Sequence, residues 1–487
     1  MILSSLASGC TSAATPVTSA GGTPQPVSKV HALVGATLLD GTGAAPVADA
    51  AVILDGDRIA CAGTRSACPV PAGATVVDVS GQWITPGLVD AHVHFSQTAW
   101  VDGRPDFVDV RDRHPYDTVQ AQQRANPERI FQSFLCSGVT AVFDVGGYPW
   151  TWDLRDKAEQ SPRAPHVAAA GPLVTHTDHP LTTMHPPSEM QFVALTDPEA
   201  GRRGVRYLHA NRSDAVKIWF LRPTPEQQGD IDARYQAVGD EARKLGIPLI
   251  AHATLLREAT IAVQAGASLL VHDVRDAIDD GFIALLKERG TIYAPTLVVS
   301  HGYQAVLAAA ISGKPPVLDD PHGCVDAESR ARIASSATLR DRLRPPPEGM
   351  TLEQVVERRR RDLDTSHQLM RDNLRRIHAA GVPIAMGTDA GNPLTLFGPS
   401  VHGAMEAMQL AGMAPMDVLV ASTRNSARAM GREADLGTIE AGKFADLLVI
   451  GADPGVDIAN MRQLRAVWRA GVNVVSHPPA GAAAGAR

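Results

Sequence analysis

Six side chains able to bind a metal or carry a proton stand inside or at the end of apolar runs of the chain. They are His92, His94, Lys217, His252, His272 and Asp389. The first two are two positions apart, so on a strand both imidazoles project to the same side and can reach one ion. Neutral imidazoles and a carboxylate are suitable ligands for a borderline metal such as zinc. The residue types therefore predict a metal centre, provided that the fold brings all six together.

Taken singly, each of these residues has an ordinary explanation. A histidine at the end of a strand is usually a satisfied polar residue, a lysine in a strand usually lies at an edge, and an aspartate before Ala390-Gly391 is usually a turn former. Lys217 is the least ordinary, because an unpaired ammonium inside an apolar run is costly. The appearance of all six in order, each associated with a strand, favours the metal site over these alternatives.

The middle of the chain alternates between apolar, strand-like runs and helical patterns. This alternation is typical of an α/β protein with a parallel core. A closed (β/α)8 TIM barrel fits the length, and in such a barrel every strand delivers its carboxyl end to the same face. The six residues would then converge there.

Short strands with turns between them precede and follow this middle part. Asp55-Gly56 between apolar runs, for example, is a strong hairpin signal. We expect both chain ends to form a two-part β-rich flank, which the family resemblance described below implies is one small β-sandwich. The expected organisation is a signal-like segment and linker (1–28), the first sandwich part (29–84), the barrel (85–436), the second sandwich part (437–478) and a disordered tail (479–487).

The composition of the 487-residue chain excludes several classes of protein. A formal net charge of -7 and an aromatic content of 5% argue against a nucleic-acid-binding surface. Hydrophobic residues at 44% and charged residues at 20% are ordinary for a globular protein. No apolar run approaches the roughly 18 residues needed to span a bilayer.

The first 28 residues do not read as part of the fold. Ala7-Ser8-Gly9-Cys10 resembles the lipobox of bacterial lipoproteins, and the tract that follows has the composition of a flexible linker. The apolar stretch before Cys10 is short, and no basic residue precedes it, unlike a usual signal peptide. We expect Cys10 to be lipidated and the protein to be periplasmic or anchored to the outer membrane. The alternative is a cytoplasmic protein with a disordered tail.

Cysteine usage is compatible with export. Cys61 and Cys68 flank a predicted turn and could face each other across a hairpin. An oxidising compartment would let them bridge, the alternative being two half-buried thiols.

These residues resemble the amidohydrolase superfamily, and within it the imidazolonepropionase-like branch that includes Xaa-Pro and Xaa-Arg dipeptidases and ochratoxin-type amidases. The resemblance runs from Val30 to Val475 and is carried by residues 85–94, Lys217, His252, His272, 387–391, 423–431 and 437–447. It implies a (β/α)8 barrel with a small β-sandwich made from both ends of the chain.

The resemblance also implies a set of metal ligands. Imidazolonepropionase itself holds one metal and lacks the lysine, so Lys217 points to the binuclear members, in which that lysine is carbamylated. Carried over, carbamylated Lys217 bridges two divalent ions, expected to be zinc. One ion is held by His92, His94 and Asp389, and the other by His252 and His272.

The activity implied is hydrolysis of a C–N amide bond in a small carboxylate-bearing substrate, a dipeptide or an N-acyl amino acid. A metal-activated hydroxide attacks the carbonyl, and Asp389 passes a proton to the leaving nitrogen. The alternatives are another bond (lactone, cyclic amide or organophosphate), deamination, or a non-catalytic binding scaffold. Lys217 argues against a deaminase, and the complete ligand set argues against a scaffold. We also expect a homo-oligomer.

Substrate contacts are less well marked. His176 and His179 lie in the loop after the third barrel strand, where family members often contact substrate, and a solvated turn is the alternative. An arginine from the charged segment 300–377 could bind a substrate carboxylate bidentately, although a solvated helix face is the simpler explanation of these charges.

Overall fold

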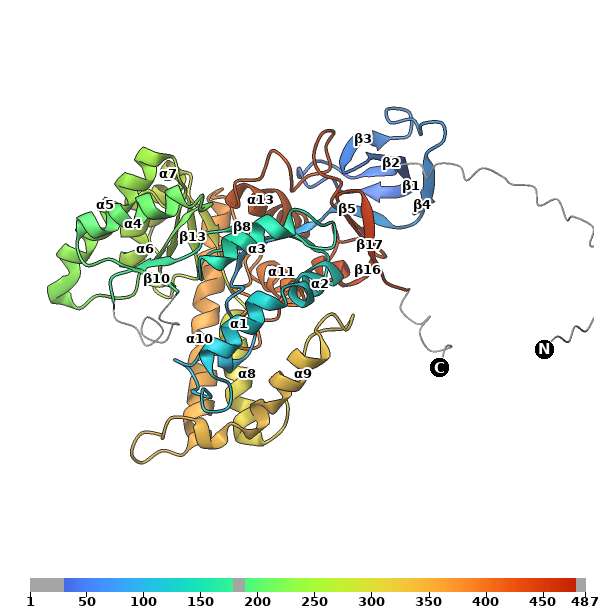
Figure 1. Ribbon diagram of the computed structural model, residues 1–487. Helices are drawn as coiled ribbons and strands as arrows, with labels where there is room; N and C mark the ends of the chain where they lie inside the picture. Colours follow the sequence, from blue (N-terminus) through green and yellow to red (C-terminus); the bar gives the residue numbers. More distant parts are fainter. Residues whose placement is uncertain (1–29, 178–188, 479–487) are drawn as a thin grey trace, which may run out of the picture.

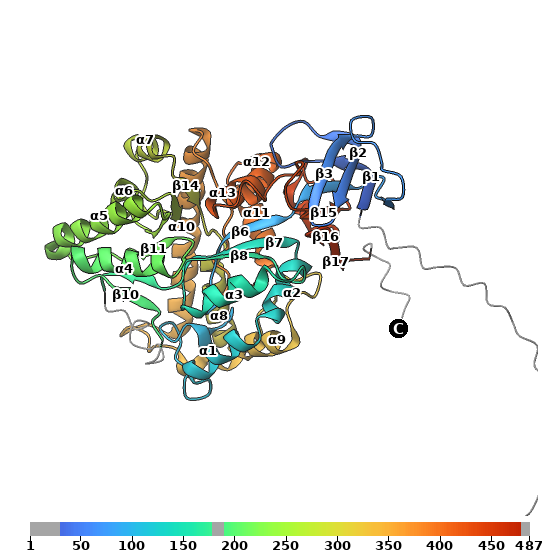
Figure 2. The ribbon, with the colours of Figure 1, turned by 45° about the horizontal axis from the view of Figure 1, so that its top comes forward.

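The computed structural model describes residues 30–177 and 189–478, and its centre is a parallel α/β core (Figures 1 and 2). One parallel sheet contains β6 (Leu88–Val93), β7 (Val139–Asp144) and β8 (His166–Ala169). The strands of a second parallel sheet are, in order, β10 (Phe192–Ala194), β9 (Leu173–Thr175), β11 (Val216–Trp219), β12 (Leu249–His252), β13 (Leu269–Val271) and β14 (Ile292–Ala294). The predicted α/β class is confirmed.

The segment 383–390 joins the two parallel sheets. On one side Ile384 pairs in parallel with Tyr293 of β14, and on the other Ala390 pairs in parallel with Val93 of β6. The amide of Ala385 donates to the carbonyl of Tyr293 over 3.0 Å, which strengthens the first of these contacts. At the opposite side, β8 and β9 follow each other closely along the chain and link one sheet to the other.

Helices connect the strands and pack against them. Local signals set their ends: the side chain of Asp197 accepts from the amide of Ala200 at 2.8 Å to begin α4, and Gly246, at φ 70°, ends α5 in the left-handed conformation. The helices of the core are α1 (Tyr116–Ala125), α2 (Glu128–Cys136), α3 (Trp150–Ala158), α4 (Pro198–Ala210), α5 (Gln228–Leu245), α6 (Leu256–Gln264), α7 (Asp280–Arg289), α11 (Ser400–Leu410), α12 (Pro415–Val420) and α13 (Ser426–Ala429).

Both ends of the described chain meet in one eight-stranded, mostly antiparallel sheet. Its two halves join where β5 pairs with β1 from the amino-terminal part and with β15 from the carboxyl-terminal part. The two chain segments predicted to form a sandwich therefore contribute strands to one hydrogen-bonded sheet, and the sandwich domain itself stays a prediction. Its strands are β1 (Val30–Leu38), β2 (Val47–Asp55), β3 (Arg58–Thr64), β4 (Thr75–Asp78), β5 (Trp83–Pro86), β15 (Leu447–Ile450), β16 (Leu464–Arg469) and β17 (Val472–Ser476).

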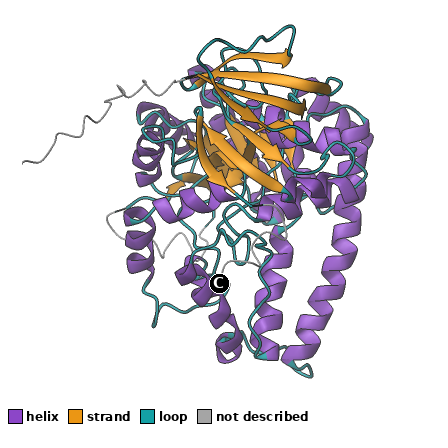
Figure 3. Ribbon diagram, turned by 90° about the vertical axis from the view of Figure 1, so that its right-hand side faces the viewer, coloured by secondary structure: helices purple, strands orange, loops and turns teal. Residues whose placement is uncertain are grey.

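A helical excursion separates β14 from the segment 383–390. It contains α8 (Val299–Ser312), α9 (Ala327–Ala334) and α10 (Leu352–Ala379), which project from the core on the side away from β1, β2 and β3 (Figures 1 and 3). Thr351 and Gln354 form a reciprocal capping box that begins α10. Among the described residues, no helix is both long and apolar enough to cross a membrane.

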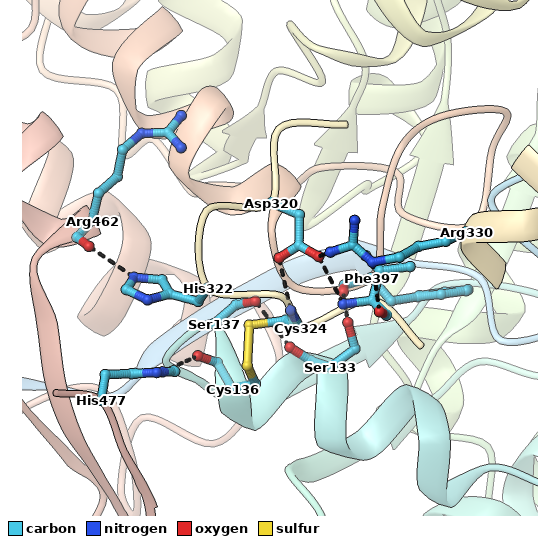
Figure 4. Close-up of a disulfide and its surroundings, with 11 residues drawn as sticks. Ser133, Cys136, Ser137, Asp320, His322, Cys324, Arg330, Phe397, Arg462 and His477 are labelled. Atoms are coloured by element: carbon cyan, nitrogen blue, oxygen red, sulfur yellow. Dashed lines mark hydrogen bonds and ion pairs between the residues drawn. A yellow bond between two sulfur atoms is a disulfide. The ribbon is translucent and has the colours of Figure 1, made fainter. Parts of the chain in front are cut away.

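Two disulfides reinforce this arrangement. The expected Cys61–Cys68 bridge is present, with the two Cα atoms 5.7 Å apart. A second bridge, which the sequence analysis did not predict, joins Cys136 at the end of α2 to Cys324 in the helical excursion (Figure 4). It spans 188 positions and so fastens the excursion to the core. Beside it, the carboxylate of Asp320 accepts from the amide of Cys324 at 2.8 Å.

Removing the long-range disulfide is expected to lower stability more than removing the short-range one. A disulfide stabilises the fold by restricting the unfolded chain, and the effect grows with the length of the loop that it closes. In the chain-entropy model the stabilisation is about 5 kcal/mol for a loop of this size and about 2 kcal/mol for a seven-residue loop. The thermal midpoint of a Cys136→Ser/Cys324→Ser double variant should therefore fall further than that of the matched Cys61→Ser/Cys68→Ser variant. Equal midpoints for the two variants in calorimetry would contradict the assigned role.

Candidate active site

The structure brings the six predicted ligand residues to the carboxyl ends of the core strands. His92 lies in β6 and His94 directly after it, Lys217 lies in β11, and His252 ends β12. His272 directly follows β13, and Asp389 lies in the joining segment 383–390. Five of the six line one cavity: His94, Lys217, His252, His272 and Asp389.

His92, His94 and Asp389 form a compact, buried ligand group. The Nε2 atoms of the two histidines are 3.2 Å apart, and they lie 3.3 and 3.2 Å from the same Oδ1 of Asp389. Burial, followed by the charge of Lys217, holds the pKa of His92 well below its usual range, so its imidazole is neutral. In the described part of the chain, Oδ1 of Asp389 has no hydrogen-bond donor. Lone pairs converging in this way fit a divalent cation.

His252, His272 and Lys217 line the same cavity as Asp389, and the ring of His272 lies 4.7 Å from that of His92 between centroids. The rings of His252 and His272 are 4.2 Å apart between centroids, and Nδ1 of His272 is 3.8 Å from Oδ2 of Asp389. The same Nδ1 is 2.9 Å from the hydroxyl of Thr296, which fixes the ring. Burial, with the neighbouring positive charges, also holds the pKa of both histidines well below the usual value.

Lys217 is an amine enclosed by the core. Its side chain is 1% exposed, and burial lowers its pKa to about 7 although the carboxylates of Asp389 and Asp144 partly oppose the shift. No ion pair within 4.0 Å involves this amine among the residues that the structure describes. Near neutral pH a large share of Lys217 is therefore uncharged and nucleophilic.

The backbone is strained at two of the six positions. His272 has φ 76° and Asp389 has φ 64°, in the left-handed region that residues other than glycine rarely adopt. Such strain is typical of functional sites. The amide of Asp389 donates to the carbonyl of His92 over 2.8 Å, and this hydrogen bond stabilises the left-handed conformation of Asp389.

Residues that sequence reasoning missed hold the ligands in place. Buried Asp90 accepts from the hydroxyl of Thr388 at 2.5 Å and from the amide of His92 at 3.2 Å, and burial raises its pKa to about 7. Gly387 packs so closely against His92 that an added Cβ would lie 2.8 Å from the Cβ of His92. The position of Asp90, two residues before His92 in the same apolar run, was the available signal.

Of the three remaining candidates, only His176 is described by the structure. Its Nδ1 is 2.8 Å from the hydroxyl of Tyr235, on α5, and it is not among the residues that line the cavity beside Asp389. Its role in binding substrate stays a prediction. His179 and Cys10 lie outside the described residues.

Comparison with known proteins decides the family. A model described as the Amidohydrolase family matches residues 83–474. The chain belongs to the amidohydrolase family. The resemblance noted in the sequence is thereby confirmed, and this amidohydrolase is a hydrolase of carbon–nitrogen bonds acting on a small-molecule substrate.

Two relatives of known name differ in their activities. An imidazolonepropionase of Caulobacter vibrioides is 27% identical over 443 residues, covering 85% of this amidohydrolase and 90% of the relative. A 5-methylthioadenosine/S-adenosylhomocysteine deaminase of Symbiobacterium thermophilum is 24% identical over 435 residues, covering 86% and 84%. Sequence similarity alone therefore does not select the substrate.

Solved structures share the fold. A Xaa-Pro dipeptidase with bound methionine has a TM-score of 0.66 at 20% identity, covering 92% of this chain and all of the dipeptidase. An ochratoxinase of A. niger has a TM-score of 0.63 at 19% identity, covering 91% of this chain and 95% of the ochratoxinase. At these identities the likeness concerns the fold alone.

Proposed function

We propose that this amidohydrolase is a binuclear metal enzyme that hydrolyses the amide bond of a dipeptide or an N-acyl amino acid. The observation that carries the proposal is the enclosure of Lys217 in the cavity that Asp389 and the histidines line. An unmodified ammonium is poorly suited to that place, whereas a carbamate supplies anionic oxygen ligands.

The ligand set divides between two ions. His92, His94 and Asp389 would hold one, His252 and His272 the other, and carbamylated Lys217 would lie between them. Imidazole and carboxylate ligands favour zinc. When bound, such ions lower the pKa of water and polarise a carbonyl group.

Asp389 is the proton carrier in this proposal. It is the one carboxylate among the described residues that line the inner cavity, and its Oδ1 has no hydrogen-bond donor there. A carboxylate so placed can accept a proton from the attacking water and deliver it to the leaving nitrogen. Its backbone, held by the carbonyl of His92, keeps the group in one position.

Two structural proposals accompany this function. The pairing of the segment 383–390 with β14 and β6 supports closure of the core into an eight-stranded (β/α)8 barrel. The disulfides Cys61–Cys68 and Cys136–Cys324 support export to an oxidising compartment. Non-reducing peptide mapping of protein from the native host tests the second proposal, and free thiols at all four positions would contradict it.

Substrate profiling tests the proposed function. The holoenzyme should hydrolyse members of a panel of dipeptides and N-acyl amino acids faster than lactones, phosphotriesters or amino-purine substrates. Ammonia release from the purines without cleavage of any amide would instead identify a deaminase.

Recovery of activity after chelation should depend on carbon dioxide and on pH. Carbamylation requires the neutral amine, and the pKa of Lys217 is lowered to about 7, so the reactive form grows as pH rises from 6 to 8. At fixed zinc and a fixed concentration of dissolved carbon dioxide, recovery should be faster at pH 8 than at pH 6, and at either pH it should be faster when carbon dioxide is supplied as bicarbonate than when it is excluded. Burial holds the pKa values of His92, His252 and His272 well below the ordinary histidine value, so these histidines are not expected to produce the trend. Recovery independent of bicarbonate would contradict a carbamate.

A further inference from the structure

A second chamber opens from the inner cavity toward α8 and α10. The two spaces share the walls formed by Arg104, His252, His272, Asp389 and Asn392. The outer chamber is further lined by Arg275, by Ser300 and Tyr303 of α8, and by residues of α10 that include Arg359. A substrate whose scissile bond lies beside Asp389 can therefore extend into this chamber.

Arg359 differs from the arginines beside it. Positions 358–361 are four consecutive arginines, and three have carboxylate partners within the helix. Arg360 pairs with Glu357 and with Asp364, both at 2.8 Å, while Arg358 and Arg361 each have a carboxylate oxygen at 3.9 Å. Arg359, the one that lines the chamber, has no ion pair or side-chain hydrogen bond within the described chain.

Arg275 faces the same chamber from the core. It lies three residues after His272, and its amide donates to the carbonyl of Thr254 over 2.8 Å, which anchors the loops that follow β12 and β13 to each other. Its guanidinium likewise has no ion pair or side-chain hydrogen bond to any residue in 30–177 or 189–478. Burial raises the pKa of nearby Asp273 to about 7, the charge of Arg275 partly opposes that rise, and Asp273 is not among the residues that line the chamber.

The other charged side chains that line the chamber have partners of opposite charge or belong to the predicted ligand group. Arg104 is held by both carboxylate oxygens of Asp106, at 2.9 and 2.8 Å. Asp362 lies 3.9 Å from Arg358, and Asp389 belongs to the ligand group. The outer chamber therefore carries two guanidinium groups that, among the described residues, form no ion pair within 4.0 Å.

We propose that Arg275 and Arg359 together bind the carboxylate on the leaving-amine half of the substrate. The inference rests on the proposed function and extends it, because it places the amino-acid product in the outer chamber and makes α10 a determinant of specificity. Guanidinium groups suit this task because they bind carboxylates bidentately. Apolar residues of the chamber, Phe107, Leu307 and Met370 among them, favour an apolar amino-acid side chain.

Kinetics with matched substrates test the inference. N-acetyl-L-leucine carries the carboxylate, and N-acetyl-L-leucinamide lacks it. Arg275→Gln and Arg359→Gln should each raise KM for the first substrate by about 10- to 100-fold, the loss of a hydrogen bond to a charged group, with little change in kcat. Arg359→Lys should restore part of the loss. With the second substrate, KM and kcat of the variants should match those of the wild type.

Arg361→Gln is the control, because Arg361 lies on the same helix, has a side chain 69% exposed and is not among the residues that line the chamber. This substitution should leave KM and kcat unchanged for both substrates. An equal rise in KM for N-acetyl-L-leucine in all three variants would overturn the inference. So would a rise in KM for N-acetyl-L-leucinamide as large as that for N-acetyl-L-leucine.

A binding measurement separates this inference from the proposed function. Calorimetric titration of the zinc-loaded enzyme with L-leucine and with L-leucinamide needs no turnover. Binding of L-leucine that weakens in Arg275→Gln and Arg359→Gln, but not in Arg361→Gln, would support the carboxylate site even if no amide were hydrolysed. Binding unaffected by either substitution would overturn it even if the enzyme is an amidase.

Discussion

Lys217→Met is expected to remove at least one metal ion and to lower kcat/KM by well over 10²-fold. Loss of a residue that merely orients a metal ligand costs about 10- to 100-fold, and loss of a bridging ligand should exceed that. Methionine has a similar length and no charge, so it fills the space left in the core. Metal analysis and steady-state kinetics of the same preparation measure both effects.

The stability of the metal-free Lys217→Met protein is the control for this variant. A buried, unpaired ammonium is costly, so replacing it with an apolar chain should leave the thermal midpoint of the metal-free protein unchanged or raised. Lys217→Ala adds a second control, because the shorter side chain leaves space for an added carboxylate such as acetate or propionate. Partial recovery of activity with these acids is expected. Full activity in either variant without an added acid would contradict the bridging role.

Asp389→Asn is expected to lower kcat by about 10²- to 10⁴-fold, the usual contribution of a general acid–base group. The amide keeps the shape of the side chain but cannot carry the proton. Asp364→Asn is the matched control, since Asp364 lies on α10 with a side chain 62% exposed and pairs with Arg360. It should retain wild-type turnover. Undiminished amide hydrolysis by Asp389→Asn would remove Asp389 from its assigned role.

The sequence predicted the parts of the site that depend on local pattern. Each of the six ligand residues ends or interrupts an apolar run, and the parallel arrangement of the strands is enough to bring them to one face.

What the sequence could not predict depends on contacts between distant segments. Nothing local to Cys136 or Cys324 marks a bridge across 188 positions. The sequence predicts His176 as a substrate contact, but its hydrogen-bond partner Tyr235 comes from α5, and no local pattern reveals that approach. The unpartnered state of Arg359 among four consecutive arginines likewise depends on which side of α10 faces the core.

The number of metal ions in the fully active enzyme tests the central claim most directly. Purified protein, loaded with zinc in the presence of bicarbonate and freed of excess metal, should contain two ions per chain when amide hydrolysis reaches its maximum. Titration of the metal-free protein should then show activity that continues to rise beyond one equivalent and saturates at two. Maximal activity with a single ion per chain would contradict the binuclear centre bridged by Lys217.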